Sequence, residues 1–287
     1  MRVYLVDGTY ELFRHYFGAP PHYSPQDGEI GAVRGVLDHL LGLLGRETHL
    51  GVATDHVIES FRNTLWPGYK TGDGIEADLL NQFQLLEDAI DALGVRLWAM
   101  VDLEADDALA AAARFAADDP TVTEVVIGTP DKDLAQCVCG SRVVCWDNRN
   151  RKVIDEAGVW EKFGVGPSSI PDYLALVGDS ADGFPGLAGW GAKSSAAVLA
   201  KWGSLENIPE DPATWGVDVR GAAKLAATLN SGRDLAGLFK ILATLRSDAA
   251  VMHSLDELRW EGPTARWPEM SERLGRPEWV ERATALQ

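Results

Sequence analysis

The segment MRVYLVDGTY, residues 1–10, contains a short apolar run at 3–6 that ends at Asp7. Short apolar runs bounded by turn-forming residues favour buried β-strands. Four further runs of this kind lie at 50–53, 95–100, 124–127 and 142–146, and a stretch with helical periodicity separates each run from the next. Strands that alternate with helices predict a mostly parallel sheet flanked by helices, an α/β fold.

Helical periodicity is clearest at 32–44, at 77–93 and in the Ala-rich stretch 106–117. After Val153 the strand signals stop, and Ala-rich helical pieces dominate up to Arg246. We therefore expect an α/β domain over residues 1–165 and a smaller helical region over 166–250. The remaining residues, 251–287, carry three tryptophans among charges and prolines, and we expect this tail to dock on the α/β domain.

The composition is that of an ordinary globular protein, since 46% of the 287 residues are hydrophobic and 24% are charged. No apolar run approaches the roughly 18 residues of a membrane span, and the first ten residues contain an aspartate, so we expect neither a span nor a signal peptide. The cysteines, Cys137, Cys139 and Cys145, lack a distant Cys or His pair at zinc spacing. They are typical of reduced thiols in a cytoplasmic protein.

Acidic residues follow the predicted strands at the point where each strand ends. In an open parallel sheet the ligand site lies beyond the carboxyl ends of the strands. Seven carboxylates are therefore expected to converge on one edge: Asp7, Asp55, Glu104, Asp106, Asp107, Asp131 and Asp133. Two more, Asp179 and Asp182 of the segment GDSADG, lie three residues apart and so on one face of a turn or helix start.

So many like charges repel one another unless cations bind among them. Ligand sets made of oxygen atoms alone favour Mg²⁺ or Mn²⁺, and the lack of a nearby Cys/His set disfavours zinc. Two such ions about 3.5–4 Å apart can polarise a phosphodiester and activate water without a protein nucleophile. Any one of these acids could instead cap a helix or lie in a solvated loop, so the metal hypothesis depends on their joint arrangement.

The formal net charge of −17 opposes a nucleic-acid-binding function, because such proteins usually present basic surfaces to phosphate. Bound divalent cations would invert the local sign of the charge at the acidic cluster. Contact with nucleic acid would then depend on local basic patches or backbone donors, and the affinity would depend on the metal.

Six motifs, in order along roughly residues 1–245, resemble those of the bacterial 5′-nucleases. They are VDG (6–8), TDHVIESFR (54–62), GYK (68–70), LEADDALA (103–110), TPDKDLAQ (129–136) and GDSADGFPGLAGWGAKSSAAVL (178–199). That family includes the 5′→3′ exonuclease domain of DNA polymerase I and free-standing flap endonucleases. The resemblance implies a PIN-like α/β core, an arch at residues 62–85 and a helix-three-turn-helix DNA-binding region, and we expect a free-standing enzyme.

The resemblance also divides the nine acids into two metal clusters. The first consists of Asp7, Asp55, Glu104, Asp106, Asp107 and Asp131, and the second of Asp133, Asp179 and Asp182. It implies two or three Mg²⁺ or Mn²⁺ ions, with Asp7 and Asp131 in the catalytic set. Arg62 and Lys70 match basic residues at the base of the arch that reach the scissile phosphate and stabilise developing negative charge. Tyr69 either stacks on a flanking base or packs beneath the arch.

A glycine-rich segment, residues 186–195, follows the last aspartate. Its glycines, Gly186, Gly189 and Gly191, let backbone N–H groups approach phosphate, and Lys193 and Ser194 open a helix whose N-terminus favours anions. Such a loop contacts the DNA backbone and does not read the bases. The resemblance adds a K⁺ ion held by the carbonyls of the loop. A glycine-rich turn between helices could also be a simple helix cap.

Three positions depart from the family pattern. Gly183 replaces the usual asparagine after the last aspartate, which removes an amide near the second metal. The basic residue common just beyond the arch is absent after Lys70, which predicts weaker arch contacts. Pro130 stands where a small flexible residue is common, and we have no physical account of it.

We therefore expect a divalent-metal 5′-nuclease that acts on DNA with 5′ flaps, 5′ overhangs or nicks during replication and repair. It is expected to be a monomer in the bacterial cytosol, associated with the nucleoid and without a membrane partner. A haloacid-dehalogenase phosphatase is excluded, because its aspartate nucleophile would fall on Leu5. Two alternatives stay open. One is a PIN-type ribonuclease, although these commonly lack the Gly-rich module. The other is a metal-deficient DNA-structure-binding relative, because Gly183 removes an amide near the second metal.

Overall fold

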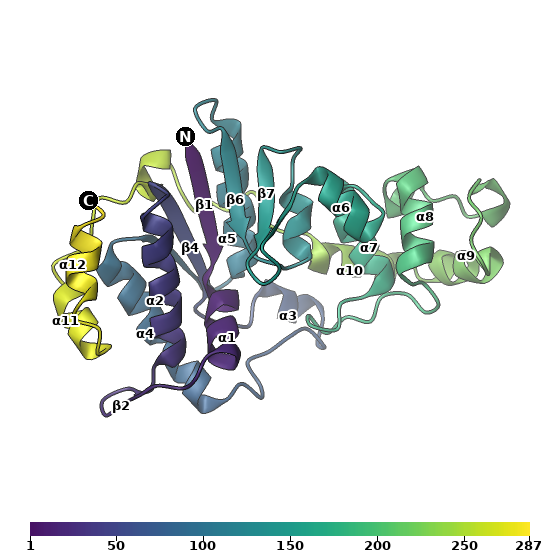
Figure 1. Cartoon of the computed structure of the whole chain (residues 1–287). Helices are drawn as coiled ribbons and strands as arrows, with labels where there is room; N and C mark the ends of the chain where they lie inside the picture. Colours follow the sequence, from purple (N-terminus) through teal and green to yellow (C-terminus); the bar gives the residue numbers. More distant parts are fainter. The chain divides into compact units, whose positions relative to one another are not determined.

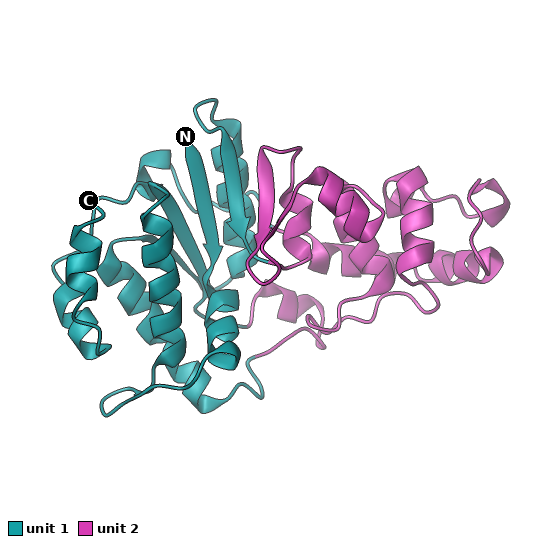
Figure 2. Cartoon of the chain, in the orientation of Figure 1, with its two compact units in different colours: residues 1–58, 72–129, 246–287 teal, residues 59–71, 130–245 magenta.

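The computed structural model describes residues 1–287, which form two compact units (Figure 2). Unit 1 comprises Met1–Ile58, Gly72–Thr129 and Arg246–Gln287, and unit 2 comprises Glu59–Thr71 and Pro130–Leu245. The chain therefore enters unit 2 twice, first for a short segment that contains the motif GYK and later for most of the helical region.

Unit 1 is built on four parallel strands in the order β5-β4-β1-β6 (Figure 1). In the central strand, Val3, Leu5 and Val6 are fully buried, as expected for a parallel strand covered on both faces. Because the strands are parallel, their carboxyl ends meet at one edge of the sheet. The four strands are β1 (Arg2–Asp7), β4 (His49–Asp55), β5 (Arg96–Met100) and β6 (Glu124–Gly128), which confirms the strands predicted for these runs.

Helices pack on both faces of the unit 1 sheet. On one face lie α1 (Gly8–Gly18), α2 (Gly31–Leu44) and α4 (Ala77–Leu93), which contact one another, and α5 (Ala105–Asp118) packs across β1, β4 and β6 on the other (Figure 1). The inner side of α5 is made of alanines such as Ala108 and Ala112, both fully buried, which allows a close approach to the strands. The predicted helices are thus confirmed, whereas the short hairpin β2 (Tyr23–Ser24) and β3 (Gly28–Glu29) was not predicted.

Part of the predicted arch is an ordinary packed helix. Residues 77–85 lie in the first half of α4, where Leu79 and Leu85 are buried. Only residues 66–76, between α3 (Phe61–Leu65) and α4, lie outside helices. The bounds of the arch, like those of the expected domains, stay predictions.

The C-terminal residues pack on unit 1. The Trp260 indole donates to the carbonyl of Leu93 at 2.8 Å, at the end of α4. The short helices α11 (Trp267–Arg273) and α12 (Trp279–Thr284) join through the stacked rings of Trp267 and Trp279, whose centroids are 6.0 Å apart, and α11 contacts α4. The 3-10 helix η5 (Leu255–Leu258) lies against β4.

Unit 2 is mostly helical, and its one strand pair is β7 with β8, which run antiparallel. The aromatic core includes Phe184 stacked on Phe239, and α7 packs along α10. No helix of the chain is both long and apolar enough to cross a membrane. Besides α3, the elements are η1 (Asp133–Cys137), β7 (Val143–Asp147), β8 (Lys152–Ile154), α6 (Glu156–Phe163), η2 (Pro167–Ser169), α7 (Ile170–Val177), α8 (Ala192–Trp202), η3 (Leu205–Asn207), η4 (Pro212–Thr214), α9 (Ala222–Ser231) and α10 (Arg233–Ala243).

Candidate metal centre

Five of the predicted carboxylates lie at the carboxyl edge of the unit 1 sheet. Asp7 ends β1 and caps α1, accepting from the Tyr10 N–H at 2.8 Å and from the Thr129 hydroxyl at 3.1 Å. Asp55 ends β4, and its Oδ1 accepts from the N–H of Ala105 at 2.8 Å. Both carboxylates are therefore held by donors at the start of a helix, where the helix dipole favours negative charge.

The other three acids of unit 1 begin α5. Glu104 is its N-cap, and its N–H donates to Oδ2 of Asp107 at 3.0 Å. Asp107 is fully buried, and its Oδ1 accepts from the N–H of Arg246 at 2.9 Å. Both Asp107 oxygens thus bind backbone donors, which favours a structural role, whereas Asp106, half-buried on the same turn, is better placed as a ligand.

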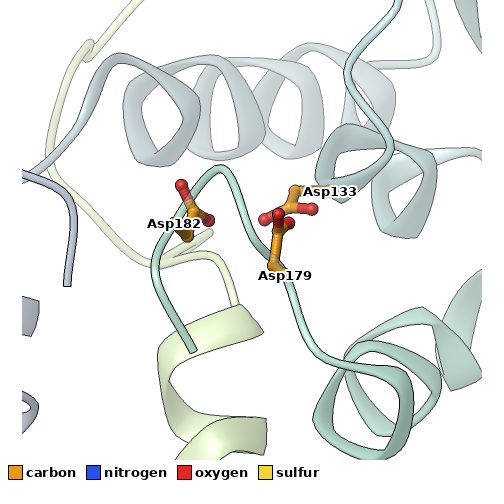
Figure 3. Close-up of side chains that lie close together, drawn as sticks. All are labelled: Asp133, Asp179 and Asp182. Atoms are coloured by element: carbon orange, nitrogen blue, oxygen red, sulfur yellow. The ribbon is translucent and has the colours of Figure 1, made fainter. Parts of the chain in front are cut away.

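Three carboxylates of unit 2 come together within the unit. Asp133, at the start of η1, and Asp179 and Asp182, in the turn after α7, each offer an oxygen atom within 4.8 Å of the others (Figure 3). The exposed fractions of Asp133, Asp179 and Asp182 are 6%, 3% and 8%, in that order. We call these three residues the acidic trio.

The turn that carries two members of the trio is closed by its own backbone. Asp179 and Phe184 exchange two N–H···O bonds, of 2.8 and 3.0 Å, and Oδ1 of Asp179 accepts from the N–H of Ala181 at 2.9 Å. Gly183 has a φ of 81°, and a Cβ on it would lie 1.9 Å from the carbonyl oxygen of Gly68. The departure from the family asparagine therefore has a steric reason, since the segment after α3 lies directly against this turn.

The electrostatics of the trio favour a bound cation. Burial, and then the charges of Asp131, Asp182 and Asp179, raise the pKa of Asp133 well above its usual range. Oδ1 of Asp133 is buried and has no hydrogen-bond partner. An oxygen-only set with one unsatisfied buried carboxylate oxygen suits a hard divalent cation and offers no soft ligand for other metals. Asp131 lies close by, and its Oδ1 accepts from the N–H of Asp133 at 3.0 Å.

Two lysines already partly neutralise the trio. Nζ of Lys132 lies 2.5 Å from Oδ2 of Asp179, and Nζ of Lys70 lies 3.3 Å from Oδ1 of Asp182. Burial alone would lower the pKa of Lys132, but the bond to Asp179 and the other carboxylates raise it overall. Sequence reasoning did not single out Lys132, although its position between Asp131 and Asp133 was a signal.

The other residues expected near the scissile phosphate are buried. Arg62 is 1% exposed, and its guanidinium donates to the carbonyls of Leu242 at 2.8 Å and Thr244 at 3.1 Å, at the end of α10. This geometry favours a helix-capping role for Arg62, and its catalytic role stays a prediction. Tyr69 is 4% exposed, which favours the packing alternative over stacking on a base.

The glycine-rich segment forms the turn before α8. Gly186, with φ 69°, approaches the chain so closely that a Cβ would lie 2.4 Å from the N–H nitrogen of Gly178. Gly189 also has a positive φ, of 86°, and Gly191 is the N-cap of α8. The Gly191 N–H donates to the Ser194 hydroxyl at 3.1 Å, and Lys193 on the first turn is exposed.

Family models match nearly the whole chain. The description of the first is 5′-3′ exonuclease, N-terminal resolvase-like domain, over residues 2–164, and that of the second is 5′-3′ exonuclease, C-terminal SAM fold, over residues 165–266.

Two curated relatives are informative. DNA polymerase I of Pseudomonas aeruginosa is 37% identical over 267 residues, which cover 88% of this chain, so the chain spans only 28% of the length of that relative. A 5′-3′ exonuclease of Aquifex aeolicus is 34% identical over 210 residues, covering 72% of this chain and 71% of the relative.

Solved structures share the fold. Bacteriophage T5 5′-exonuclease with bound zinc superposes with a TM-score of 0.65 at 19% identity, covering 96% of this chain and 100% of the other. The catalytic core of Rad2 in complex with a DNA substrate gives 0.64 at 16% identity, covering 100% and 92%.

Proposed function

The chain belongs to the 5′-3′ exonuclease family, and on that premise we propose that it hydrolyses DNA phosphodiesters at 5′ ends and 5′ flaps with divalent cations as cofactors. The acidic trio carries the proposal. A buried carboxylate with an unsatisfied oxygen, beside two more carboxylates, is costly without a cation and well suited to one. The related T5 protein co-crystallised with metal ions and the related Rad2 core in complex with a DNA substrate support the same cofactor and substrate classes.

We assign one cation to the trio and a second to the acids at the edge of the unit 1 sheet. The proposed ligands in unit 1 are Asp7, Asp55, Glu104 and Asp106, while Asp107 holds the start of α5 and Asp131 stays the predicted further ligand. Divalent cations, when bound, would polarise the phosphodiester and lower the pKa of water to make a nucleophile. Mg²⁺ and Mn²⁺ fit the oxygen-only ligand sets, and a third ion stays a prediction.

Positive side chains beside the trio support charge stabilisation during cleavage. Lys70 and Lys132 hold ammonium groups against Asp182 and Asp179, where they also balance charge on a phosphate bound at this site. We propose that Lys70 contacts the phosphate and that Arg62 holds the segment of Lys70 in place by capping α10. Asn63 adds to this support, since its amide donates to the carbonyl of Lys70 at 2.9 Å.

The loop before α8 is the proposed grip on the DNA backbone. The backbone N–H of Gly189, the exposed Lys193 and the N-terminus of α8 favour phosphate without reading sequence. We propose further that this loop binds a K⁺ ion and that the protein acts as a monomer. Its proposed substrates are DNA with 5′ flaps, 5′ overhangs or nicks.

A cleavage assay tests the proposal against its alternatives. An end-labelled 5′-flap DNA duplex is incubated with EDTA, Mg²⁺ or Mn²⁺, beside an RNA of the same sequence and a phosphomonoester. We expect metal-dependent release of the DNA flap with 5′-phosphate products. Preference for the RNA would favour a PIN-type ribonuclease, and binding of the flap without cleavage in any metal would favour a metal-deficient DNA-binding protein.

A further inference from the structure

The tip of the β7–β8 hairpin presents a run of positive charge on a chain whose net charge is −17. The strands pair Asp147 with Lys152, and the four residues between them, Asn148 to Arg151, form the tip. Arg149 and Arg151 are exposed, as are the residues up to Val153. Lys152 pairs with Glu161 at 3.0 Å, while neither arginine has a carboxylate partner.

The one acid at the tip is directed inward. Asp147 is 8% exposed, and its Oδ1 accepts from the N–H groups of Arg149 at 2.9 Å and Asn150 at 3.0 Å. Its Oδ2 accepts from the Asn150 amide at 2.7 Å. These three bonds fix the turn and leave a positive outer surface, because the carboxylate is committed to donors of the turn itself.

Arg151 occupies a backbone conformation that suits glycine. Its φ of 52° makes it the one residue other than glycine with a positive φ. An arginine there costs about 1 kcal/mol relative to glycine, which has no Cβ to clash. An arginine at an exposed position that suits glycine therefore points to a function for its side chain.

The hairpin is tied to the acidic trio within unit 2. Cys145 of β7 lies against η1, with its Sγ 3.5 Å from the carbonyl oxygen of Leu134, the residue after Asp133. A strand rises about 3.3 Å per residue, so Arg149 lies within roughly 13 Å of this contact along the hairpin.

We propose that the hairpin tip is a further contact with the DNA phosphate backbone, made by Arg149, Arg151 and Lys152. The inference rests on the proposed DNA substrate. Guanidinium groups bind phosphate through paired N–H donors, and contacts of this kind give affinity without sequence preference. The tip thereby supplies the local basic patch that DNA binding requires on so acidic a chain.

The experiment compares DNA affinity with folding stability. Binding of a fluorescent 5′-flap duplex is followed by anisotropy between 50 and 200 mM KCl, with Ca²⁺ in place of Mg²⁺ to limit cleavage, and unfolding is followed separately in EDTA. Arg151→Gly is expected to weaken binding about threefold or more while unfolding at the same temperature as the parent or higher, because the strain at φ 52° is relieved. The double variant Arg149→Gln/Arg151→Gly is expected to reduce the slope of the logarithm of the binding constant against the logarithm of the KCl concentration. The expected reduction in the magnitude of that slope is about 1–2.

The matched control removes the same charge elsewhere. Arg46→Gln/Arg266→Gln changes two exposed arginines of unit 1 and is expected to leave the salt dependence of binding unchanged. Equal losses of DNA affinity in the control and in the hairpin variant would overturn this inference. So would an unchanged affinity of the hairpin variant beside a wild-type chain that binds and cuts the flap. Either result would leave the proposed function intact. A wild-type chain that neither binds nor cuts DNA would overturn the proposed function with it.

Discussion

The acids of unit 1 and the acids of unit 2 are held in opposite ways. In unit 1, Asp7, Asp55 and Asp107 accept hydrogen bonds from backbone N–H groups. The donors to Asp55 and Asp107 lie at the start of α5. In unit 2, Asp133 is buried among carboxylates with an unsatisfied oxygen, and lysine side chains supply the balancing charge. The unit 1 acids are thus stabilised mainly by backbone donors, whereas the trio depends more on positive charge, from the two lysines and from a cation that binds there.

The largest effect should be on cleavage, where the two sets are expected to be equally necessary. Asp7→Asn in unit 1 and Asp179→Asn in unit 2 should each lower the single-turnover cleavage rate on the order of a hundred- to a thousandfold. Flap binding should change far less. If either variant cleaves at the rate of the parent, the substituted residue is not a ligand of a catalytic metal.

Lys70→Ala should lower the cleavage rate more than it weakens flap binding. An electrostatic group that acts on developing charge typically contributes about a hundredfold in rate. The measurement is kcat beside the binding constant for the same flap, and Lys193→Ala, on the exposed turn of α8, should show the reverse pattern. Weakened binding at an unchanged rate would remove Lys70 from contact with the transition state.

Metal should stabilise the fold through the trio. Mn²⁺ at a hundredfold excess over its dissociation constant should add about 2.7 kcal/mol to the free energy of unfolding. Asp133→Asn should abolish the part of this gain that depends on the trio. It should also raise stability in EDTA, because it replaces a carboxyl group whose ionisation is opposed by burial and by the neighbouring aspartates. Thermal unfolding with and without Mn²⁺ measures both, and a variant that responds to Mn²⁺ like the parent would place the cation elsewhere.

Restoring the family asparagine should damage unit 2. Gly183→Asn brings a Cβ to within 1.9 Å of the Gly68 carbonyl oxygen, and we expect a loss of about 2 kcal/mol or more in chemical unfolding. Gly203→Asn is the matched control, since its φ of 77° is similar and no atom lies within 4 Å of its Cβ. Equal costs at the two sites would show that the backbone conformation, and not the contact with Gly68, requires glycine.

The smallest effect is a pair of opposite pH dependences in EDTA. Burial would raise the pKa of Glu11 in unit 1, but bonds from His15 and Arg14 lower it from 4.5 to about 2, so its contribution should be lost as pH falls through that range. The raised pKa of Asp133 has the reverse sign, so stability should fall as pH rises from the usual Asp range toward that pKa. Melting temperatures of Glu11→Gln and Asp133→Asn, measured against pH beside the parent, separate the contributions of the two groups. If the two variants changed the pH dependence in the same way, the opposite pKa shifts of Glu11 and Asp133 would be refuted.

Much of the fold could be predicted because its signals are local. The parallel strands follow from short apolar runs, and α4 was predicted with the bounds Ala77–Leu93 that the structure has. The strand β8 and the β2–β3 hairpin were missed because two or three residues, some of them exposed, carry too little pattern to detect.

Predictions for the site were limited by tertiary contacts. The positions of the acids follow from strand ends, and the structure places five of them at one edge of unit 1. The burial of Arg62 was not predictable, because the carbonyls that it caps belong to Leu242 and Thr244, 180 and 182 residues further along the chain. The close approach of Gly68 to Gly183 is of the same kind.

The early visit of the chain to unit 2 determines where the protein can be cut. The two family models meet between residues 164 and 165, which suggests a natural point of dissection. A fragment ending there would keep Arg62 and Trp66 but lose the Leu242 carbonyl and the Phe239 ring that they contact. The apolar surface left behind would be exposed to proteases and to aggregation. Boundaries drawn from sequence alone are thus a poor guide for fragment expression, and the polypeptide is best handled whole.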